Sequence, residues 1–168
     1  MGRLIVVFGL AAVLAGAAVA STSFVIRNDE SIGTFAVKKD GTLGGLQSAF
    51  GKPSRLKRTR DGCLALWAPI GLRVSLYNLV GGNPCRPKSG YFSEAVLSGK
   101  RWSTNRGLQV GDAFERLHRL YPTARLHGKL WWLIPRFTQA TGSYPGLAAR
   151  VIGGGVASFQ VIYGAGGE

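Results

Sequence analysis

The chain has 168 residues and a formal net charge of +13, with 46% hydrophobic and 17% charged residues. This composition excludes a disordered or an acidic chain and supplies enough apolar side chains for a folded core. The positive surplus favours cell-wall polymers, anionic lipid headgroups or acidic proteins as partners, although an arginine-rich proteome alone would also produce it.

The N-terminal segment has the pattern of a secretory signal peptide. Arg3 supplies a positive charge, an apolar core follows, and Ala18-Val19-Ala20 forms a small-residue cleavage site. We therefore predict a signal peptide at 1–20 and a secreted or extracytoplasmic domain at 21–168. An uncleaved anchor is the alternative, because the uncharged stretch is close to the shortest that spans a bilayer. We expect no membrane span after signal removal.

A short helix is predicted after Gly41. Thr42 is suited to cap its N-terminus, and Gly51 in a left-handed conformation and Pro53 are suited to end it. Apolar side chains recur at helical spacing: Leu43, Leu46 and Phe50.

A strongly basic segment, Arg55–Arg60, follows this helix. Neither face of such a strand can be fully buried, so we predict an edge strand or a solvated rim. The alternative is an anion-binding patch, made by Lys52, Arg55, Lys57, Arg58 and Arg60.

Three further strands are predicted in this half. Cys63–Ala68 and Leu72–Val80 are separated by a Pro-Ile-Gly turn and form a hairpin, and Tyr91–Leu97 follows a turn-rich loop. Two cysteines in an exported chain predict a disulfide between Cys63 and Cys85, the alternatives being free buried thiols or intermolecular pairing.

The stretch Gly107–Leu126 contains the clearest helix signal in the chain. Asp112 is a good N-cap, Glu115 completes a capping box, and Pro122 ends the helix. The apolar stripe falls on Phe114, Leu117 and Tyr121.

The chain after this helix predicts three more strands and a long loop. Lys129–Ile134 is followed by a loop at Pro135–Pro145, and a Gly-Gly-Gly turn joins Leu147–Ile152 to Val156–Tyr163. A basic strand precedes them, as in the first half.

The two halves therefore share one order of elements. A shift of 71 residues superimposes the apolar positions of the first helix on those of the second, although a chance match is an alternative. We predict a single α+β domain with two tandem helix-then-strand repeats, at about 33–98 and about 102–163.

A family resemblance follows from this order, from the GLxVGD opening at Gly107–Asp112 and from the Leu-x-x-Leu-Tyr-Pro run that ends at Pro122. The chain resembles the secreted β-lactamase inhibitor protein fold and the related small outer-membrane-assembly lipoprotein domains. The resemblance implies antiparallel strands of both repeats joined in a curved sheet, helices on one face, and protein binding through the sheet and its loops. No inhibitory loop residue of that family maps onto this sequence.

Groups for catalysis are sparse. His118 and His127 are the only histidines, and the sequence has no HExxH, no CxxC, no G-x-S-x-G and no P-loop. His118 borders the apolar stripe, where a structural histidine is expected. We predict no enzyme, with no catalytic residues, no metal site and no cofactor.

Adjacent tryptophans give the clearest hint of a binding surface. Trp131 and Trp132 point to opposite faces of one strand, so one indole faces away from the helices unless loops cover it. Trp67 and Tyr77 could extend that surface. We predict an exported non-catalytic protein that binds another protein, the alternative being electrostatic binding to an anionic cell-envelope polymer or membrane surface; nucleic acid is not an expected partner.

Overall fold

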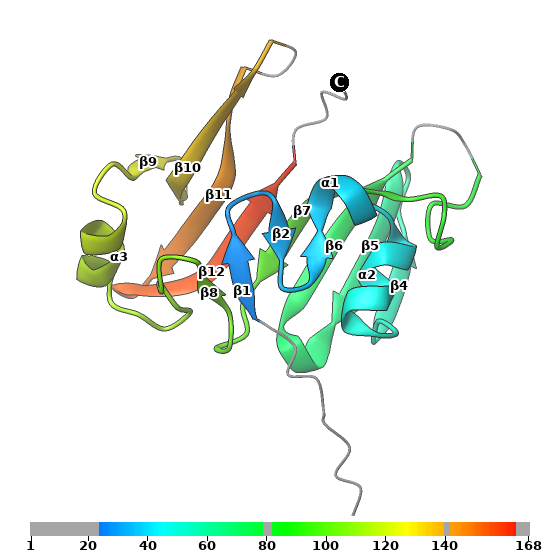
Figure 1. Ribbon diagram of the computed structural model, residues 1–168, viewed down its shortest axis with the longest axis horizontal. Helices are drawn as coiled ribbons and strands as arrows, with labels where there is room; N and C mark the ends of the chain where they lie inside the picture. Colours follow the sequence, from blue (N-terminus) through cyan, green and yellow to red (C-terminus); the bar gives the residue numbers. More distant parts are fainter. Residues whose placement is uncertain (1–23, 79–81, 140–141, 164–168) are drawn as a thin grey trace, which may run out of the picture.

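A computed structural model describes residues 24–78, 82–139 and 142–163 (Figure 1). Within these ranges the backbone forms twelve strands, three short α-helices and one 3-10 turn. The predicted signal peptide at 1–20 lies outside the described residues. Two internal segments, 79–81 and 140–141, also lie outside the described residues.

Eight strands form one antiparallel sheet, and their order in space differs from their order in sequence. The order is β4-β5-β6-β7-β12-β11-β10-β9, so β7 pairs with β12 at the centre while β4 and β9 are the edges. The strands are β4 (Arg55–Arg58), β5 (Gly62–Trp67), β6 (Leu72–Tyr77), β7 (Tyr91–Leu97), β9 (Arg125–His127), β10 (Leu130–Thr138), β11 (Gly142–Ile152) and β12 (Gly155–Ile162).

A second, four-stranded sheet is built from much shorter strands. Its order is β3-β2-β1-β8, and β1 pairs antiparallel with β2 but parallel with β8. Its members are β1 (Val25–Arg27), β2 (Ser31–Ile32), β3 (Phe35–Ala36) and β8 (Ser103–Thr104).

The helices are α1 (Val37–Asp40), α2 (Leu43–Phe50) and α3 (Phe114–Leu120), and a 3-10 turn spans Ala68–Ile70. They lie with the four-stranded sheet on the same side of the eight-stranded sheet (Figure 1). The buried side chains of both sheets and of the helices form one apolar cluster between these layers.

The predicted α+β class with tandem helix-strand repeats is wrong, because the described residues are mainly strand and belong to two sheets. Two causes stand out. The helices are only four to eight residues long, and α2 contains Gly44 and Gly45, which weaken a helix. The strands of the smaller sheet have two or three residues, too few to show a periodic pattern.

Two local predictions also fail. Pro135–Pro145 is not a long loop: β10 continues to Thr138, β11 begins at Gly142, and the two prolines face each other across the hairpin beside an irregular register. Asp112 does not cap α3, whose N-cap is Ala113 without a side-chain hydrogen bond. The carboxylate instead accepts from the backbone N–H of Gln109 (2.7 Å) and pairs with Arg116 (3.1 Å).

Other local predictions are confirmed. Thr42 caps α2, since its hydroxyl accepts from the backbone N–H of Gly45 (3.2 Å). Gly51 follows the end of α2 as predicted, but the predicted left-handed conformation is not observed, because its φ of 76° is combined with a ψ of −168°. Gly153 and Gly154 have φ of 59° and 78° in the turn between β11 and β12, a conformation that favours glycine.

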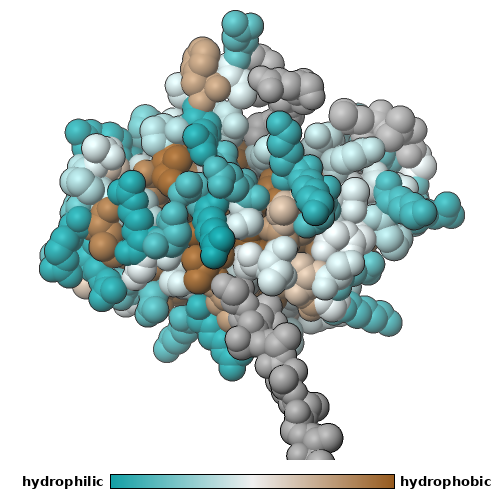
Figure 2. All heavy atoms as spheres, in the orientation of Figure 1, coloured by the Kyte–Doolittle hydropathy of each residue, from teal (hydrophilic) through white to brown (hydrophobic). Residues whose placement is uncertain are grey.

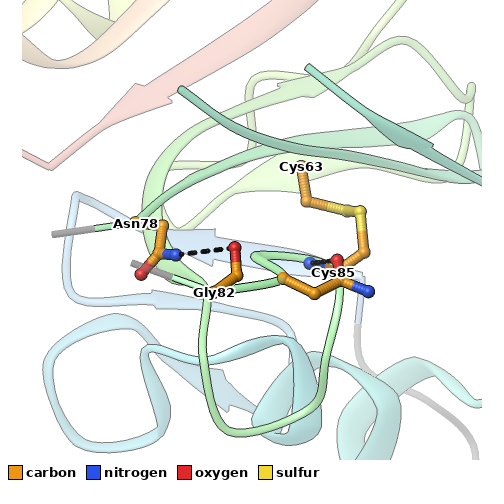
Figure 3. The surroundings of a disulfide bond; sticks show 5 residues. Cys63, Asn78, Gly82 and Cys85 are labelled. Carbon is orange, nitrogen blue, oxygen red and sulfur yellow. Dashed lines mark hydrogen bonds between the residues drawn. A yellow bond between two sulfur atoms is a disulfide. The ribbon is translucent and has the colours of Figure 1, made fainter. Parts of the chain in front are cut away.

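The predicted disulfide joins Cys63 on β5 to Cys85 in the loop after β6 (Figure 3). The loop is held further by two side-chain hydrogen bonds: Asn78 donates to the carbonyl of Gly82 (3.5 Å), and the backbone N–H of Cys85 donates to Asn83 (3.0 Å). Gly44 of α2 donates to the carbonyl of Pro87 in the same loop (2.8 Å), so the disulfide loop is tied to the helix layer.

Candidate binding face

The eight-stranded sheet has one face against the core and one face away from it. In β5, Cys63, Ala65 and Trp67 are buried in the core, while Leu64 and Leu66 are partly exposed. Successive side chains of a strand point to opposite faces, so cross-strand partners of Leu64 and Leu66 share the second face. We call this second face the outer face.

One continuous row of cross-strand pairs crosses the outer face from edge to edge. Pairing from each strand to the next carries the row through all eight strands. Its members, in spatial order, are Arg55, Leu66, Arg73, Val96, Gln160, Ala148, Trp132 and Arg125. We call this set the outer-face row.

The outer-face row contains three arginines, four apolar residues and one glutamine, and only its first four members alternate between basic and apolar. Arg55, Arg73 and Arg125 are exposed, and none of them belongs to the three ion pairs found among the described residues. The neighbouring row contains Lys57 and one acid, Glu94, which accepts from Gln160 (2.8 Å). The uncompensated charge of this face is therefore positive, and it attracts acidic partners.

Aromatic rings lie at two places on the outer face, one on the central strands β6 and β7 and one near the β9 edge. Tyr77 and Tyr91 are cross-strand partners with ring centroids 6.1 Å apart, and Tyr91 is 41% exposed. At the other end, Trp132 stacks on His127, with centroids 4.0 Å apart and planes 17° from parallel. Rings held in this way offer contact area at little cost in side-chain entropy.

Two of the four predicted partner-binding residues do not belong to the outer face. Trp67 is only 3% exposed, packs on Phe50, and donates its indole N–H to the carbonyl of Gly51 (2.9 Å), so its proposed surface role is wrong. Trp131 faces the helix side, with its ring 4.8 Å from that of Phe114. The opposite orientations predicted for Trp131 and Trp132 are thus observed.

The five predicted anion-binding residues do not share one face of the sheet. All four residues of this edge strand are exposed. Arg55 and Lys57 pair with Leu66 and Leu64 and so belong to the outer face. Arg58 pairs with the buried Cys63 and therefore points the other way, whereas Lys52 and Arg60 are exposed residues outside the strand.

The two histidines lie on opposite faces. His118 of α3 contacts the rings of Phe114 (4.5 Å) and Trp131 (4.9 Å) edge-on, and His127 is stacked on Trp132. Across the described ranges, no three His, Cys, Asp or Glu residues gather closely enough to hold a metal ion. No helix within those ranges has the length and apolarity needed to cross a membrane.

Within the described part of the chain, the pKa values of Tyr121 and Arg136 are raised, and both groups lie away from the outer-face row. Burial raises the pKa of Tyr121, while the Thr104 hydroxyl and the charge of Arg106, whose guanidinium lies 4.9 Å from the ring centroid, lower it less. Hydrogen bonds to Asp29 raise the pKa of Arg136. These shifts come from packing and from an ion pair.

Sequence reasoning missed several members of the outer face, notably Val96, Gln160 and Tyr91. The alternation within Leu72–Tyr77 already placed Arg73, Ser75 and Tyr77 on one side. The missing step was the pairing of β7 with β12, which joins the two halves of the chain and cannot be derived from the period of either strand.

The fold and this face define the class of molecule: a mainly β, two-sheet protein with a basic open sheet face. No protein-family model and no curated protein matches the chain. Among solved structures the chain is similar to an extracellular protein containing an SCP domain from Bacillus anthracis strain Ames, with 12% sequence identity and a TM-score of 0.42. That match covers 73% of this chain and 43% of the other. A likeness this weak supports no inference about fold or function.

Proposed function

We propose that the protein is an exported, non-catalytic binding protein that contacts an acidic surface of another protein through the outer face. The observation that carries this proposal is the outer-face row, which crosses eight strands and contains a half-buried tryptophan and three arginines that belong to none of the ion pairs among the described residues. Arginine, tryptophan and tyrosine dominate the energetics of protein interfaces.

The size of the face suits such an interface. Seven spacings of about 4.8 Å separate eight strands, so the row is about 34 Å long. A standard interface buries about 800 Å² on each partner, and a patch of that area has a width similar to the length of this row. The outer face can therefore provide a complete interface without a large contribution from loops.

The disulfide between Cys63 and Cys85 is consistent with an extracellular location, because such bonds persist in oxidising compartments. Export through the signal peptide at 1–20 is part of the proposal. Mass spectrometry of the N-terminus of the secreted chain tests it: a mature chain that begins at Ser21 supports cleavage, and a retained N-terminus contradicts it.

Partner capture from the envelope and culture fractions tests the interface. Immobilised wild-type protein should retain a partner that Trp132→Ala and Tyr77→Ala variants retain at least tenfold less, because both rings lie on the outer face. Lys38→Ala/Lys39→Ala is a matched control on α1, on the other side of the sheet. Equal retention by all variants would contradict the proposed face.

A second candidate function is electrostatic binding to an anionic envelope polymer or membrane surface. The exposed edge strand β4, with Arg55, Lys57 and Arg58, favours it. Binding of this kind weakens steeply with ionic strength, whereas an aromatic-centred protein interface weakens little. Sedimentation with anionic vesicles at low and high salt separates the two candidates.

A further inference from the structure

The edge strand β4 leaves one side of its backbone open. In the described part of the chain, β5 pairs with β4 on one side and no strand pairs with it on the other. All four of its side chains are exposed, and Leu56 is 41% exposed. Figure 1 places this edge at one end of the sheet, beside α2, and Figure 2 shows mainly hydrophilic and neutral side chains over that end of the molecule. An open edge of this kind is a place where an extended chain can add as a further strand.

The hydrogen bonds between β4 and β5 show which backbone groups remain open. The N–H of Thr59, directly after β4, donates to the carbonyl of Gly62 at the start of β5 (2.9 Å). In an antiparallel pair, residues whose N–H and C=O face the neighbouring strand alternate with residues whose groups face away from it. Counted back from Thr59, the residues that face away from β5 are Arg58 and Leu56. Both therefore direct an N–H donor and a C=O acceptor to the open edge.

The side chains of β4 determine which chain fits this edge. Arg55, Lys57 and Arg58 belong to none of the ion pairs among the described residues. A second copy of this strand would place these cations opposite like charges, which is unfavourable for cross-strand neighbours. An acidic strand would place carboxylates opposite them, which is favourable. The charge of β4 therefore disfavours self-association through this edge and favours an acidic partner strand.

The alternation of β4 specifies the order of residues in such a partner. Arg55 and Lys57 lie on the outer face, whereas Leu56 and Arg58 lie on the helix side. Cross-strand partners share a face, so an antiparallel partner would place an acidic residue opposite each cation and an apolar residue opposite Leu56. Along the partner strand, the complementary pattern is acidic, acidic, apolar, acidic.

We propose that β4 binds an extended acidic segment of a protein partner, which adds to the sheet as a further antiparallel strand. Backbone hydrogen bonds at Leu56 and Arg58 hold the segment, and its carboxylates contact the cations of β4. This mode of contact goes beyond the docking of a folded surface on the outer face. It shares Arg55 with the outer-face row, but it does not depend on Trp132, which lies six strands away.

Amide hydrogen exchange of the isotope-labelled protein tests the strand addition directly. The probe is an acetylated and amidated peptide, Thr-Glu-Glu-Val-Glu-Thr, which contains the complementary pattern. Saturating peptide should slow exchange at Leu56 and Arg58 at least tenfold, because both amides gain an acceptor, and should change exchange at Lys57, which already faces β5, less than twofold. Unchanged exchange at Leu56 and Arg58, or their protection by phosphatidylglycerol vesicles but not by the peptide, would overturn the proposal.

Two isomers of the peptide separate strand pairing from attraction between charges. One isomer is N-methylated at its second and fourth residues and the other at its third and fifth, so the two have equal charge but different blocked amides. In a strand only one of these sets of amides faces β4. One isomer should therefore bind at least tenfold more weakly than the other in a calorimetric titration. Equal affinities would show attraction without strand pairing and would contradict the proposal.

Variants of the protein locate the site. Leu56→Pro removes one donor from an edge that tolerates proline and should weaken peptide binding at least tenfold, whereas Leu56→Ala keeps the donor and should weaken it less than threefold. Arg55→Ala/Lys57→Ala should weaken binding about tenfold, and Lys38→Ala/Lys39→Ala, which removes the same charge from α1, less than twofold. Equal effects of the two charge variants would show that only the net charge matters and would refute the β4 site.

The Trp132→Ala variant distinguishes this inference from the proposed outer-face interface. Peptide binding should change less than twofold in this variant, because Trp132 lies on β10 and not at the β4 edge. A tenfold loss would contradict the β4 site. If the peptide does not bind the wild type while Trp132→Ala still lowers partner capture, the β4 inference fails and the outer-face proposal stands.

Discussion

At the scale of single residues, Arg136 and Asp29 connect the two sheets. Arg136 on β10 donates from Nη2 to Oδ1 (2.6 Å) and from Nε to Oδ2 (3.0 Å) of Asp29, which lies in the β1–β2 turn 107 residues away in sequence. Asp29 is 12% exposed and Arg136 40%. A bidentate pair of this kind has more orientational specificity than an ordinary surface ion pair.

Removal of this pair should lower the free energy of unfolding. We expect Asp29→Asn to destabilise the fold by about 1–2 kcal/mol, since the partly buried guanidinium loses its counter-charge and one of its two acceptors, and the amide NH2 faces it as a second donor. Urea denaturation measures the effect. Asp61→Asn is the control, because Asp61 and Arg60 are over 90% exposed and 3.9 Å apart, and it should leave the midpoint unchanged. Equal midpoints for both variants would contradict the role of Asp29.

Tyr121 gives a prediction about alkaline pH. Its pKa in the folded chain is raised above the ordinary value of 10.0, mainly by burial. Above that ordinary value the unfolded chain releases this proton more readily than the folded chain does, so stability should fall as the pH rises, by up to about 1.4 kcal/mol per pH unit.

The Tyr121→Phe variant isolates this contribution, because phenylalanine cannot ionise. Urea unfolding at pH 9 and pH 11 should show a smaller loss of stability in the variant than in the wild type. An identical loss in both proteins would show that other groups cause the alkaline dependence and that burial does not perturb Tyr121.

At the scale of elements, hairpins with clear alternation were predictable and short strands were not. Tyr91–Leu97 was predicted with its observed bounds, and Gly153 and Gly154 marked the β11–β12 turn. Strands β2, β3 and β8 have only two residues each, too few to show an alternating pattern. They form because they pair with neighbouring strands and pack on the core. Pro135 and Pro145 led to the wrong prediction of a loop. Both prolines lie within the β10–β11 hairpin, where the register is irregular and proline is tolerated.

The α3 terminus shows a second limit of pattern reasoning. Asp112 and Glu115 have the spacing of a capping box, but the helix begins one residue later than that spacing requires, at an Ala113 N-cap. The isolated bridge between Ala113 and Gly155 explains the difference, because it ties the start of the helix to the β11–β12 hairpin. A partner distant in sequence thus sets the boundary.

The disulfide makes a prediction at this scale. Cys63→Ala/Cys85→Ala should lower the free energy of unfolding by about 3 kcal/mol, because a bridge across 22 residues restricts the unfolded chain. Chemical denaturation of the variant and of reduced wild-type protein should give similar midpoints. Labelling of two thiols in the non-reduced wild type would contradict the bridge.

At the scale of the whole molecule, the pairing of β7 with β12 decides both fold and site. It joins two four-strand halves into one sheet, and it completes the row that connects Arg73 to Trp132. The sequence predicted most strands of each half but not the second sheet, so the predicted fold class was wrong. Part of the outer face, by contrast, could be predicted, because the alternation in the sequence placed Arg73, Ser75 and Tyr77 on one side of their strand.

The exposed arginines of the outer face should increase the rate of association with an acidic partner. Arg73→Ala/Arg125→Ala should slow association with the captured partner on the order of tenfold at low salt and much less at high salt, because exposed charges steer encounter and are screened. Surface plasmon resonance at two ionic strengths measures this. A rate that is unchanged at low salt would show that the arginines do not face the partner.

The central claim is that the partner docks on the outer face, and site-specific photo-crosslinking tests it most directly. A photoreactive residue at Val96, in the middle of the outer-face row, should crosslink to a protein partner in the envelope or culture fraction. The same residue at Ser48, exposed on α2 across the sheet, should not. Crosslinks from Ser48 without crosslinks from Val96 would contradict the account.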